Sequence, residues 1–338
     1  MPATDSHCWV GVDLGGTKIL TGVFDASLKL LGTAKVSTRA ERGLDTVCER
    51  IERCIREALE GAGHKLAQVR AIGIGAPGAV DADRSTVLFA PNLPGWRNVP
   101  LGRRLARALD RPVVVGNDAN VCTLGVHEVE LRAQPRHLVG VFVGTGIGGG
   151  LVLNGQLYEG ASHTAAEIGH MILEVNGPKC GCGNRGCWEA LASRTAIYRR
   201  LRQAVDAGEK TILTDWLGRE LEDLRSNELR KAWHHGDKLV RRILLQTADY
   251  LGLGIASLVN LLNPEVVALG GGLIQALHAE LMPRITETAR ARMMPGSERA
   301  LTLLASRLGD HAGITGAAVL ARRALEDAPA RTAGVKRA

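Results

Sequence analysis

Apolar and polar positions along the chain predict short strands that alternate with helices. In the first third, three strands follow one another, and helices with one apolar face then alternate with buried strands. The expected strands are 8–14, 19–24, a third ending at 35, 69–75 and 113–115, and the expected helices are 46–59 and 101–109. This order describes one alternating α/β unit.

The same order begins again in the second half of the chain. An apolar strand is followed by a glycine-rich turn, a second strand, an Asn154-Gly155 hairpin signal and a third strand, at 137–143, 144–150, 151–153 and 156–158. The repetition indicates an internal duplication, in which two similar lobes turn their glycine-rich turns toward a shared crevice. Chance similarity between glycine-rich hairpins is the alternative.

The rest of the chain is mostly helical, with two further strands. The stretch 194–242 is charged and carries no strand pattern, and the elements after it are expected as helices at 244–260, 273–280 and 314–325 and strands at 266–269 and 301–304. We expect an N-terminal α/β lobe over residues 1–120, with a C-terminal helix at 312–326 packed back on it, and a larger C-terminal lobe over 121–311. No Pro- or Ser-rich linker separates them, so a hinge is expected.

Length and hydropathy limit the class of protein. A chain of 338 residues can bury a large core and favours two packed domains with a cleft between them. No apolar run approaches the roughly 18 residues that cross a bilayer, so no membrane partner is expected. The first residues are polar and lack the pattern of a signal peptide, which predicts a cytoplasmic protein.

The charge is basic but dispersed. A formal net charge of +7 suits anionic ligands such as nucleotides. The positive residues are spread along helical stretches and only 3% of residues are aromatic, so most of the charge is interpreted as solvated surface and no nucleic-acid partner is expected. The alanine-rich basic end from Arg322 to Arg337 is expected to fray, with nucleic-acid binding there as the minor alternative.

Three glycine-rich turns are candidates for nucleotide binding. In the first, at 13–18, uncovered amides, a hydroxyl and a cation can meet phosphate oxygens at a strand end, and the acid can hold Mg²⁺. The others are 144–150 and 270–272, the latter between a strand and a helix, where an adenosine group can lie against backbone. The candidate residues are Asp13, Gly15, Gly16, Thr17, Lys18, Gly144, Thr145, Gly146, Gly271 and Gly272. Plain turns and tight strand–helix packing are the alternatives. Neither the P-loop spacing nor the dinucleotide-binding spacing occurs between a strand and a helix, which argues against Walker-type NTPases and Rossmann dehydrogenases.

One carboxylate has the position of a catalytic base. Asp118, in Asn117-Asp118-Ala119-Asn120, closely follows a short strand and is expected to project into the crevice. Phosphoryl transfer to an alcohol needs a group that accepts the hydroxyl proton and orients it toward the γ-phosphate. Helix capping by Asn or Asp at this segment is the alternative.

Further polar residues suit a polyhydroxylated ligand. Asn92 lies in a loop with Trp96, and Glu167, His170 and Glu189 add two carboxylates and an imidazole that can share several vicinal hydroxyls. Together with Asn117 and Asp118 they are the candidate sugar-binding residues. An ordinary loop and surface charges on a helix are the alternatives.

Three of the seven cysteines are crowded into eight positions. Cys180, Cys182 and Cys187 follow His170, and a Cys₃His set fits one tetrahedral, structural Zn²⁺. Such an ion would fix the loop that carries Glu167 and Glu189. The spacing departs from ordinary zinc fingers, so disulfide or redox roles stay open.

These motifs together resemble the ROK family of repressors and sugar kinases, most closely its bacterial glucokinases, over nearly the whole chain. The resemblance implies an actin-like, hexokinase-type α/β fold of two similar lobes around a central cleft, with ATP and Mg²⁺ in the cleft and closure on sugar binding. It implies that Asp118 takes the proton of the sugar 6-hydroxyl, that Asn92, Asn117, Glu167, His170 and Glu189 contact the sugar, and that His170 also binds zinc. A homodimer or homotetramer is likewise implied.

The chain departs from the family pattern beside the sugar residues. Many relatives have glycine before the acid of the zinc-proximal motif, whereas Ala165 and Ala166 precede Glu167 here. Trp188 falls at a variable position and is expected to shape the outer wall of the pocket. Either difference can shift substrate preference.

Two other function classes compete with a kinase. A repressor needs a DNA-binding helix-turn-helix, and only twelve residues precede Asp13. A non-catalytic sugar-binding module does not need Asp118 or three phosphate turns. We therefore expect an ATP-dependent hexose kinase, with glucose first, N-acetylmannosamine, N-acetylglucosamine or another hexose as alternatives, and polyphosphate as an alternative donor.

Overall fold

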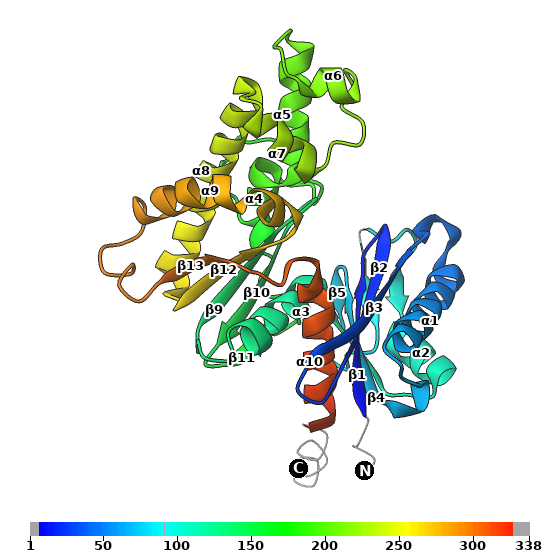
Figure 1. Ribbon diagram of the computed structural model, residues 1–338. Coiled ribbons are helices and arrows are strands. Elements are labelled where there is room, and N and C mark those ends of the chain that lie inside the picture. Colours follow the sequence, from blue (N-terminus) through cyan, green and yellow to red (C-terminus); the bar gives the residue numbers. More distant parts are fainter. Residues whose placement is uncertain (1–6, 91, 327–338) are drawn as a thin grey trace.

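Two five-stranded mixed sheets organise the computed structural model, which describes residues 7–90 and 92–326 (Figure 1). The first sheet has the order β3-β2-β1-β4-β8 and the second the order β11-β10-β9-β12-β13. Their strands are β1 (Cys8–Leu14), β2 (Lys18–Phe24), β3 (Leu30–Ser37), β4 (Val69–Ala76), β8 (Val113–Asn117), β9 (Leu138–Val143), β10 (Ile147–Leu153), β11 (Gln156–Tyr158), β12 (Val266–Gly270) and β13 (Thr302–Ala305).

Both sheets have the same topology. In each, three strands pair antiparallel in chain order, and the first of them pairs parallel with a later strand that pairs parallel with the last. This repetition confirms the two similar α/β lobes that the sequence pattern predicted. The carboxyl ends of β1 and β9 lead into the two glycine turns, at equivalent places of the two lobes.

The first sheet is buried between helices. Its central strand β1 is almost wholly apolar and buried, whereas the outer strand β3 alternates partly buried and exposed residues. The helices α1 (Leu44–Gly61) and α2 (Leu101–Leu109) lie on one side. On the other side α10 (Ala312–Glu326) packs on β1 and β4 and against α3 (Asp118–Gly125), so the last helix that the structure describes covers the first sheet.

Close approach of α10 depends on glycines. A Cβ added at Gly73 of β4 would overlap the carbonyl oxygen of Ala317, and one added at Gly316 would overlap that of Val121 in α3. The backbones are therefore in direct contact, and α10 and α3 form a closely packed pair between the two sheets.

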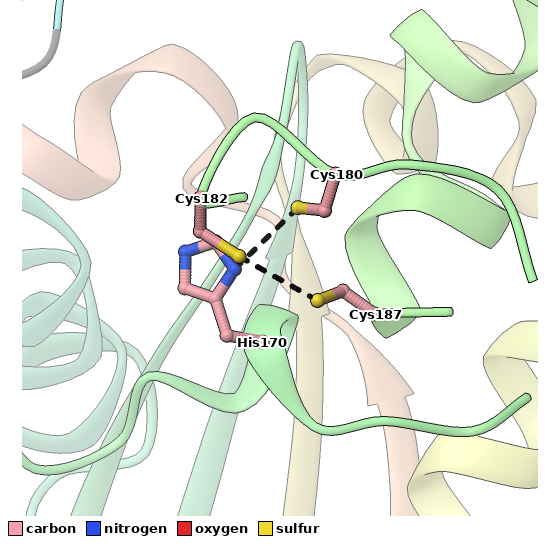
Figure 2. A group of neighbouring side chains, drawn as sticks. All are labelled: His170, Cys180, Cys182 and Cys187. Atoms are coloured by element: carbon pink, nitrogen blue, oxygen red, sulfur yellow. Dashed lines mark hydrogen bonds between the residues drawn. The ribbon is translucent and has the colours of Figure 1, made fainter. Parts of the chain in front are cut away.

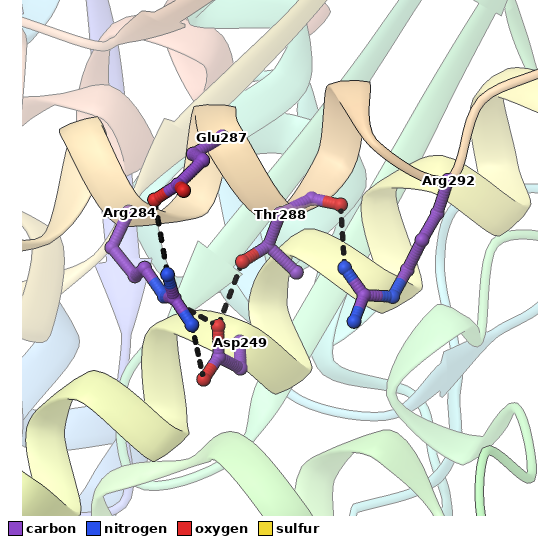
Figure 3. Close-up of polar contacts among 5 residues, drawn as sticks. All are labelled: Asp249, Arg284, Glu287, Thr288 and Arg292. Atoms are coloured by element: carbon purple, nitrogen blue, oxygen red, sulfur yellow. Dashed lines mark hydrogen bonds and ion pairs between the residues drawn. The ribbon is translucent and has the colours of Figure 1, made fainter.

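The second lobe carries most of the helices. They are α4 (Trp188–Ala192), α5 (Arg194–Asp206), α6 (Leu213–Leu217), α7 (Ser226–His234), α8 (Lys238–Leu262) and α9 (Gly272–Arg290). A polar cluster joins α8 to α9: Asp249 accepts hydrogen bonds from Arg284 Nε at 2.7 Å and Thr288 Oγ1 at 2.7 Å (Figure 3).

The sequence pattern misjudged α8. We expected no apolar run of membrane-spanning length, but α8 has 25 residues and a mean hydropathy of 1.2 in its most apolar window. By length and composition it could cross a bilayer, yet 61% of that window is buried inside the protein. It is therefore the central core helix of this lobe, and its contacts with α9 explain its apolar composition.

Other differences are local. The glycine turn predicted at 144–150 is short, because Ile147 already pairs in β10. The helix predicted to end at 280 continues as α9 past Pro283, with a break in helical dihedrals at Leu277. Three short strands of a third sheet, β5 (Ala79–Val80), β6 (Val87–Phe89) and β7 (Arg97–Val99), were not predicted. The predicted fraying is wrong for Arg322 and Arg323, which lie in α10 and pair with Glu128. Beyond 326 the basic end lies outside the described residues, so its fraying stays a prediction.

Candidate active site

A cleft of about 610 Å³ receives residues from both lobes. Its lining includes residues from all three predicted groups, namely the phosphate turns, the catalytic segment and the sugar-binding set. Those members are Asp13, Asn92, Asn117, Asp118, Gly144, Thr145, Gly146, Glu167, His170, Glu189 and Gly271. The other predicted residues, Gly15, Gly16, Thr17, Lys18, Gly272 and the three clustered cysteines, lie outside the lining.

Asp118 is the first residue of α3, directly after β8. The helix cap is Asn117, whose side-chain oxygen accepts from the Asn120 N–H at 3.0 Å while its amide donates to the Gly78 carbonyl at 3.0 Å. Asp118 Oδ1 accepts from the Ala119 N–H at 2.8 Å. The capping role that the sequence left open therefore falls to Asn117, and Asp118 is free to face the cleft.

Two of the four acids that line the cleft, Asp13 and Asp118, have raised pKa values. Burial raises the pKa of Asp118 to about 6, and the charge of Glu167 adds to the shift. Burial likewise raises the pKa of Asp13 to about 7, with further contributions from Asp118 and Asp310. A carboxylate with a pKa near neutrality is well suited to accept a proton, and a second buried acid beside it favours a bound cation.

The first glycine turn lies against Asn92 at the cleft. Gly15 N–H donates to the Lys18 carbonyl at 2.9 Å and closes the turn, and a Cβ at Gly16 would come within 2.9 Å of the Asn92 carbonyl oxygen. The Lys18 ammonium lies 2.7 Å from the Asp310 carboxylate, at the surface. This cation is therefore paired with an acid rather than directed into the cleft.

The second glycine turn is tied to Glu189. Gly144 N–H donates to the Gly146 carbonyl at 2.9 Å, and Glu189 Oε2 accepts from the Ile147 N–H at 2.9 Å. A Cβ at Gly146 would overlap the Glu189 carboxylate, so any larger residue there would displace this side chain. Gly271, at the third turn, has φ 85° and packs against the backbone of Val143. All three turns thus meet backbone or acid groups closely.

A Cys₃His cluster lies beside the cleft (Figure 2). The candidate ligand atoms of His170, Cys180, Cys182 and Cys187 all lie within 4.8 Å of one another. Cys180 Sγ is 3.7 Å from His170 Nδ1, and Cys182 Sγ is 3.7 Å from Cys187 Sγ. Tetrahedral Zn²⁺ with usual bond lengths gives ligand separations of about 3.6–3.8 Å, so the four side chains fit this metal.

His170 connects that cluster to the cleft. Its Nδ1 faces Cys180, whereas its Nε2 lies 3.9 Å from Glu167 Oε2, and both His170 and Glu167 line the cleft. Directly before Glu167, Ala166 has φ 67°, in the left-handed region that favours glycine. The alanine noted in the sequence therefore stands where the backbone itself prefers glycine.

Sequence reasoning missed a set of contacts from α5. Arg194 N–H donates to the Gly144 carbonyl at 3.0 Å, Arg194 Nη2 donates to Thr145 Oγ1 at 2.8 Å, and Thr195 Oγ1 donates to the Thr145 carbonyl at 2.8 Å. These residues lie in the charged stretch from which no site was predicted. Only the Ser193 N-cap, which accepts from the Ala196 N–H, was a usable signal of a helix start there.

The chain is similar to known proteins over nearly its whole length. Residues 9–324 match the family described as "ROK family". The chain is 36% identical over 309 residues to a glucokinase of Thermotoga maritima, covering 91% of this chain and 95% of the relative. It is 33% identical over 333 residues to an N-acetyl-D-glucosamine kinase of Salmonella typhimurium, covering 92% and 98%.

A solved structure is similar to the same extent. The crystal structure of a ROK family glucokinase from Streptomyces griseus, in complex with glucose and AMPPNP, superposes with a TM-score of 0.83 at 34% identity, and the match covers 94% of this chain and 99% of that one.

Proposed function

The chain belongs to the ROK family, and we propose that it is a glucokinase that transfers the γ-phosphoryl group of ATP to the 6-hydroxyl of glucose. Its fold is the actin-like, hexokinase-type α/β fold. The similar proteins named glucokinase, at up to 36% identity, favour glucose over N-acetylglucosamine. The enzyme class is an ATP-dependent sugar kinase.

One observation carries this proposal. Asp118, with its pKa raised to about 6, and the glycine turn at 144–146 line the same cleft of about 610 Å³. A base and a phosphate-binding turn across one cleft are the parts that phosphoryl transfer to an alcohol needs. A sugar-binding module or a repressor has no use for the base.

In the reaction, Asp118 accepts the proton of the 6-hydroxyl as its oxygen attacks the γ-phosphorus. The bond from that phosphorus to the bridging oxygen of ATP breaks, ADP leaves, and the sugar carries the phosphoryl group. Asp13 is the residue proposed to hold Mg²⁺, which would neutralise phosphate charge. Its carboxyl group suits this ion, because a buried acid with a pKa near 7 favours a nearby cation. The phosphates are proposed to lie on the turns at 13–18 and 144–146, and the adenosine group beside Gly271 and Gly272.

The sugar hydroxyls are proposed to bind Asn92, Asn117, Glu167, His170 and Glu189. Support comes from their shared position on the lining of the cleft. Asn117 already donates to the Gly78 carbonyl, so the second hydrogen of its amide group is the one available to the sugar.

The Cys₃His cluster is proposed to hold a structural Zn²⁺. With four protein ligands the ion would have no open position, so it supplies rigidity and no chemistry of the reaction. His170 and Cys187 flank the segments that carry Glu167 and Glu189, and the metal would keep these acids at the sugar.

The wider organisation is also part of the proposal. We propose that residues 1–120 with helix 312–326 form one lobe, that 121–311 form the other, and that the lobes close on the sugar.

All seven cysteines are free, which fits a reducing, cytoplasmic environment. A homodimer or homotetramer is proposed from the family resemblance and is checked by light scattering.

The test is ADP release from ATP and Mg²⁺ across a panel of glucose, N-acetylglucosamine, N-acetylmannosamine, allose and fructose, repeated with polyphosphate as donor. We expect the highest kcat/KM for glucose, with the phosphate on the 6-oxygen by ³¹P NMR. A higher kcat/KM for an N-acetylhexosamine would contradict the glucose assignment. No turnover of any sugar by folded protein would contradict the kinase.

A further inference from the structure

The lining of the cleft carries acids where an anionic nucleotide is proposed to bind. Among the described residues, its ionisable members are Asp13, Asp118, Glu167, Glu189, Cys122 and His170, and neither lysine nor arginine is present. A triphosphate is itself negative, and Mg²⁺ compensates only part of its charge. A further cation at the phosphate turns would relieve this repulsion.

Lys18 is the cation that the sequence suggested for this purpose. The structure pairs its ammonium with Asp310 at 2.7 Å. The net charge of that pair is zero, so it contributes little to the field at the phosphates.

Arg194 is placed differently. Its Nη2 donates to Thr145 Oγ1 at 2.8 Å, and Thr145 lines the cleft at the second glycine turn. Within residues 7–90 and 92–326, no carboxylate forms an ion pair with Arg194. A guanidinium without an acid partner thus lies at the rim of the cleft, next to the proposed phosphate site.

The backbone around Arg194 fixes this position. Its N–H donates to the Gly144 carbonyl at 3.0 Å, and Thr195 Oγ1 donates to the Thr145 carbonyl at 2.8 Å. Arg194 is also the first residue of the thirteen-residue helix α5, so the positive end of the helix dipole faces the same turn.

We propose that Arg194 is a catalytic residue that contacts the phosphates of the bound nucleotide, a role that rests on the proposed kinase function. One N–H of its guanidinium holds Thr145 in the free protein, and the other donors of the planar group remain for phosphate oxygens. The charge of Arg194 then offsets the acids of the cleft during nucleotide binding and phosphoryl transfer.

Two substitutions separate this role from a structural one. Arg194→Gln keeps an N–H donor for Thr145 Oγ1 and removes the charge, and Arg194→Lys keeps the charge. We expect the KM for ATP with Mg²⁺ to rise about tenfold in Arg194→Gln and much less in Arg194→Lys, because a charge-assisted hydrogen bond is lost only in the former. The KM for glucose stays unchanged in both. The control is Arg225→Met, whose side chain is 75% exposed and distant in sequence from the cleft residues.

Direct binding of AMPPNP and Mg²⁺, measured by calorimetry without sugar, keeps the inference independent of turnover. Weaker binding in Arg194→Gln than in Arg194→Lys, with a wild-type unfolding midpoint and a smaller dependence on ionic strength, supports it. Equal weakening of both variants, or wild-type affinity in Arg194→Gln, overturns it. If the wild type binds AMPPNP but phosphorylates no sugar, the kinase proposal fails and the Arg194 comparison still decides this one; if it binds none, both are overturned.

Discussion

Asp118 and Asp13 are two acids with raised pKa values in one cleft, and they link activity to pH. The role proposed for Asp118, accepting the sugar proton, requires its ionised form, and its pKa of about 6 lies below that of Asp13, at about 7. Because the two groups interact, they titrate as a pair. The ionised pair is populated at high pH and is lost as the pH falls.

We therefore expect kcat/KM for glucose to decline from about pH 7 and more steeply below pH 6, since kcat/KM reports the free enzyme. The measurement is a pH–rate profile from pH 5.5 to 9, with circular dichroism to show that the protein stays folded. A flat profile down to pH 5.5 contradicts the assignment of Asp118 as the base.

Ala166 allows a second prediction at this scale. Its φ of 67° costs an L-residue roughly 1–2 kcal/mol, which glycine does not incur. Part of this gain is offset because glycine loses more conformational entropy on folding. Ala166→Gly should raise the free energy of unfolding by about 1 kcal/mol in urea titration.

The neighbouring alanine provides the control for that substitution. Ala165 is not among the residues with positive φ, so Ala165→Gly should lower stability or leave it unchanged. If both substitutions destabilise the protein equally, the left-handed conformation of Ala166 contributes no strain.

At the scale of elements, the contact between α10 and α3 is set by glycine. Propensity alone predicts that Gly316→Ala stabilises a helix by about 1 kcal/mol. A Cβ there would overlap the Val121 carbonyl, so we expect a loss of at least about 2–3 kcal/mol instead. Gly61→Ala in α1, where no atom lies within 4 Å of the added Cβ, should be neutral or stabilising. Denaturant midpoints measure the stability of both variants. A Gly316→Ala protein as stable as the wild type would contradict the close crossing of α10 and α3.

The Cys₃His cluster allows a prediction about metal. Cys182→Ser should lose bound zinc, lower the thermal midpoint and raise the KM for glucose more than that for ATP, because the loop holding Glu167 and Glu189 loosens. Cys54→Ser is the control, since its thiol lies in the other lobe and donates to the Ala34 carbonyl. Atomic absorption measures zinc per chain. Equal zinc in wild type and Cys182→Ser contradicts a Cys₃His site.

At the scale of the whole molecule, the sequence predicted the features that depend on the local order of residues along the chain. The buried strand β1, the hairpin at Asn154-Gly155 and the repeated order of elements could be read directly, because periodicity and turn residues are local properties. The resemblance to one family also predicted that the three glycine turns share one cleft. Asp13, Gly144, Thr145, Gly146 and Gly271 do line it, whereas the rest of the first turn and Gly272 do not.

What the sequence could not supply depends on contacts between distant segments. Arg194 meets Thr145 across 49 positions, and Lys18 pairs with Asp310 across 292. Neither contact leaves a periodic signal. The strands β5, β6 and β7 are two or three residues long, too short for an alternation to be recognised.

The proposed phosphoryl transfer depends on Asp118 as its base. The most direct measurement is the kcat of Asp118→Asn with glucose, ATP and Mg²⁺, together with calorimetric binding of glucose and AMPPNP to the same variant. We expect kcat to fall by a factor of about 10²–10⁴ while both ligands still bind, since the amide keeps the shape of the side chain and cannot accept the proton. A kcat within a fewfold of the wild type would contradict it.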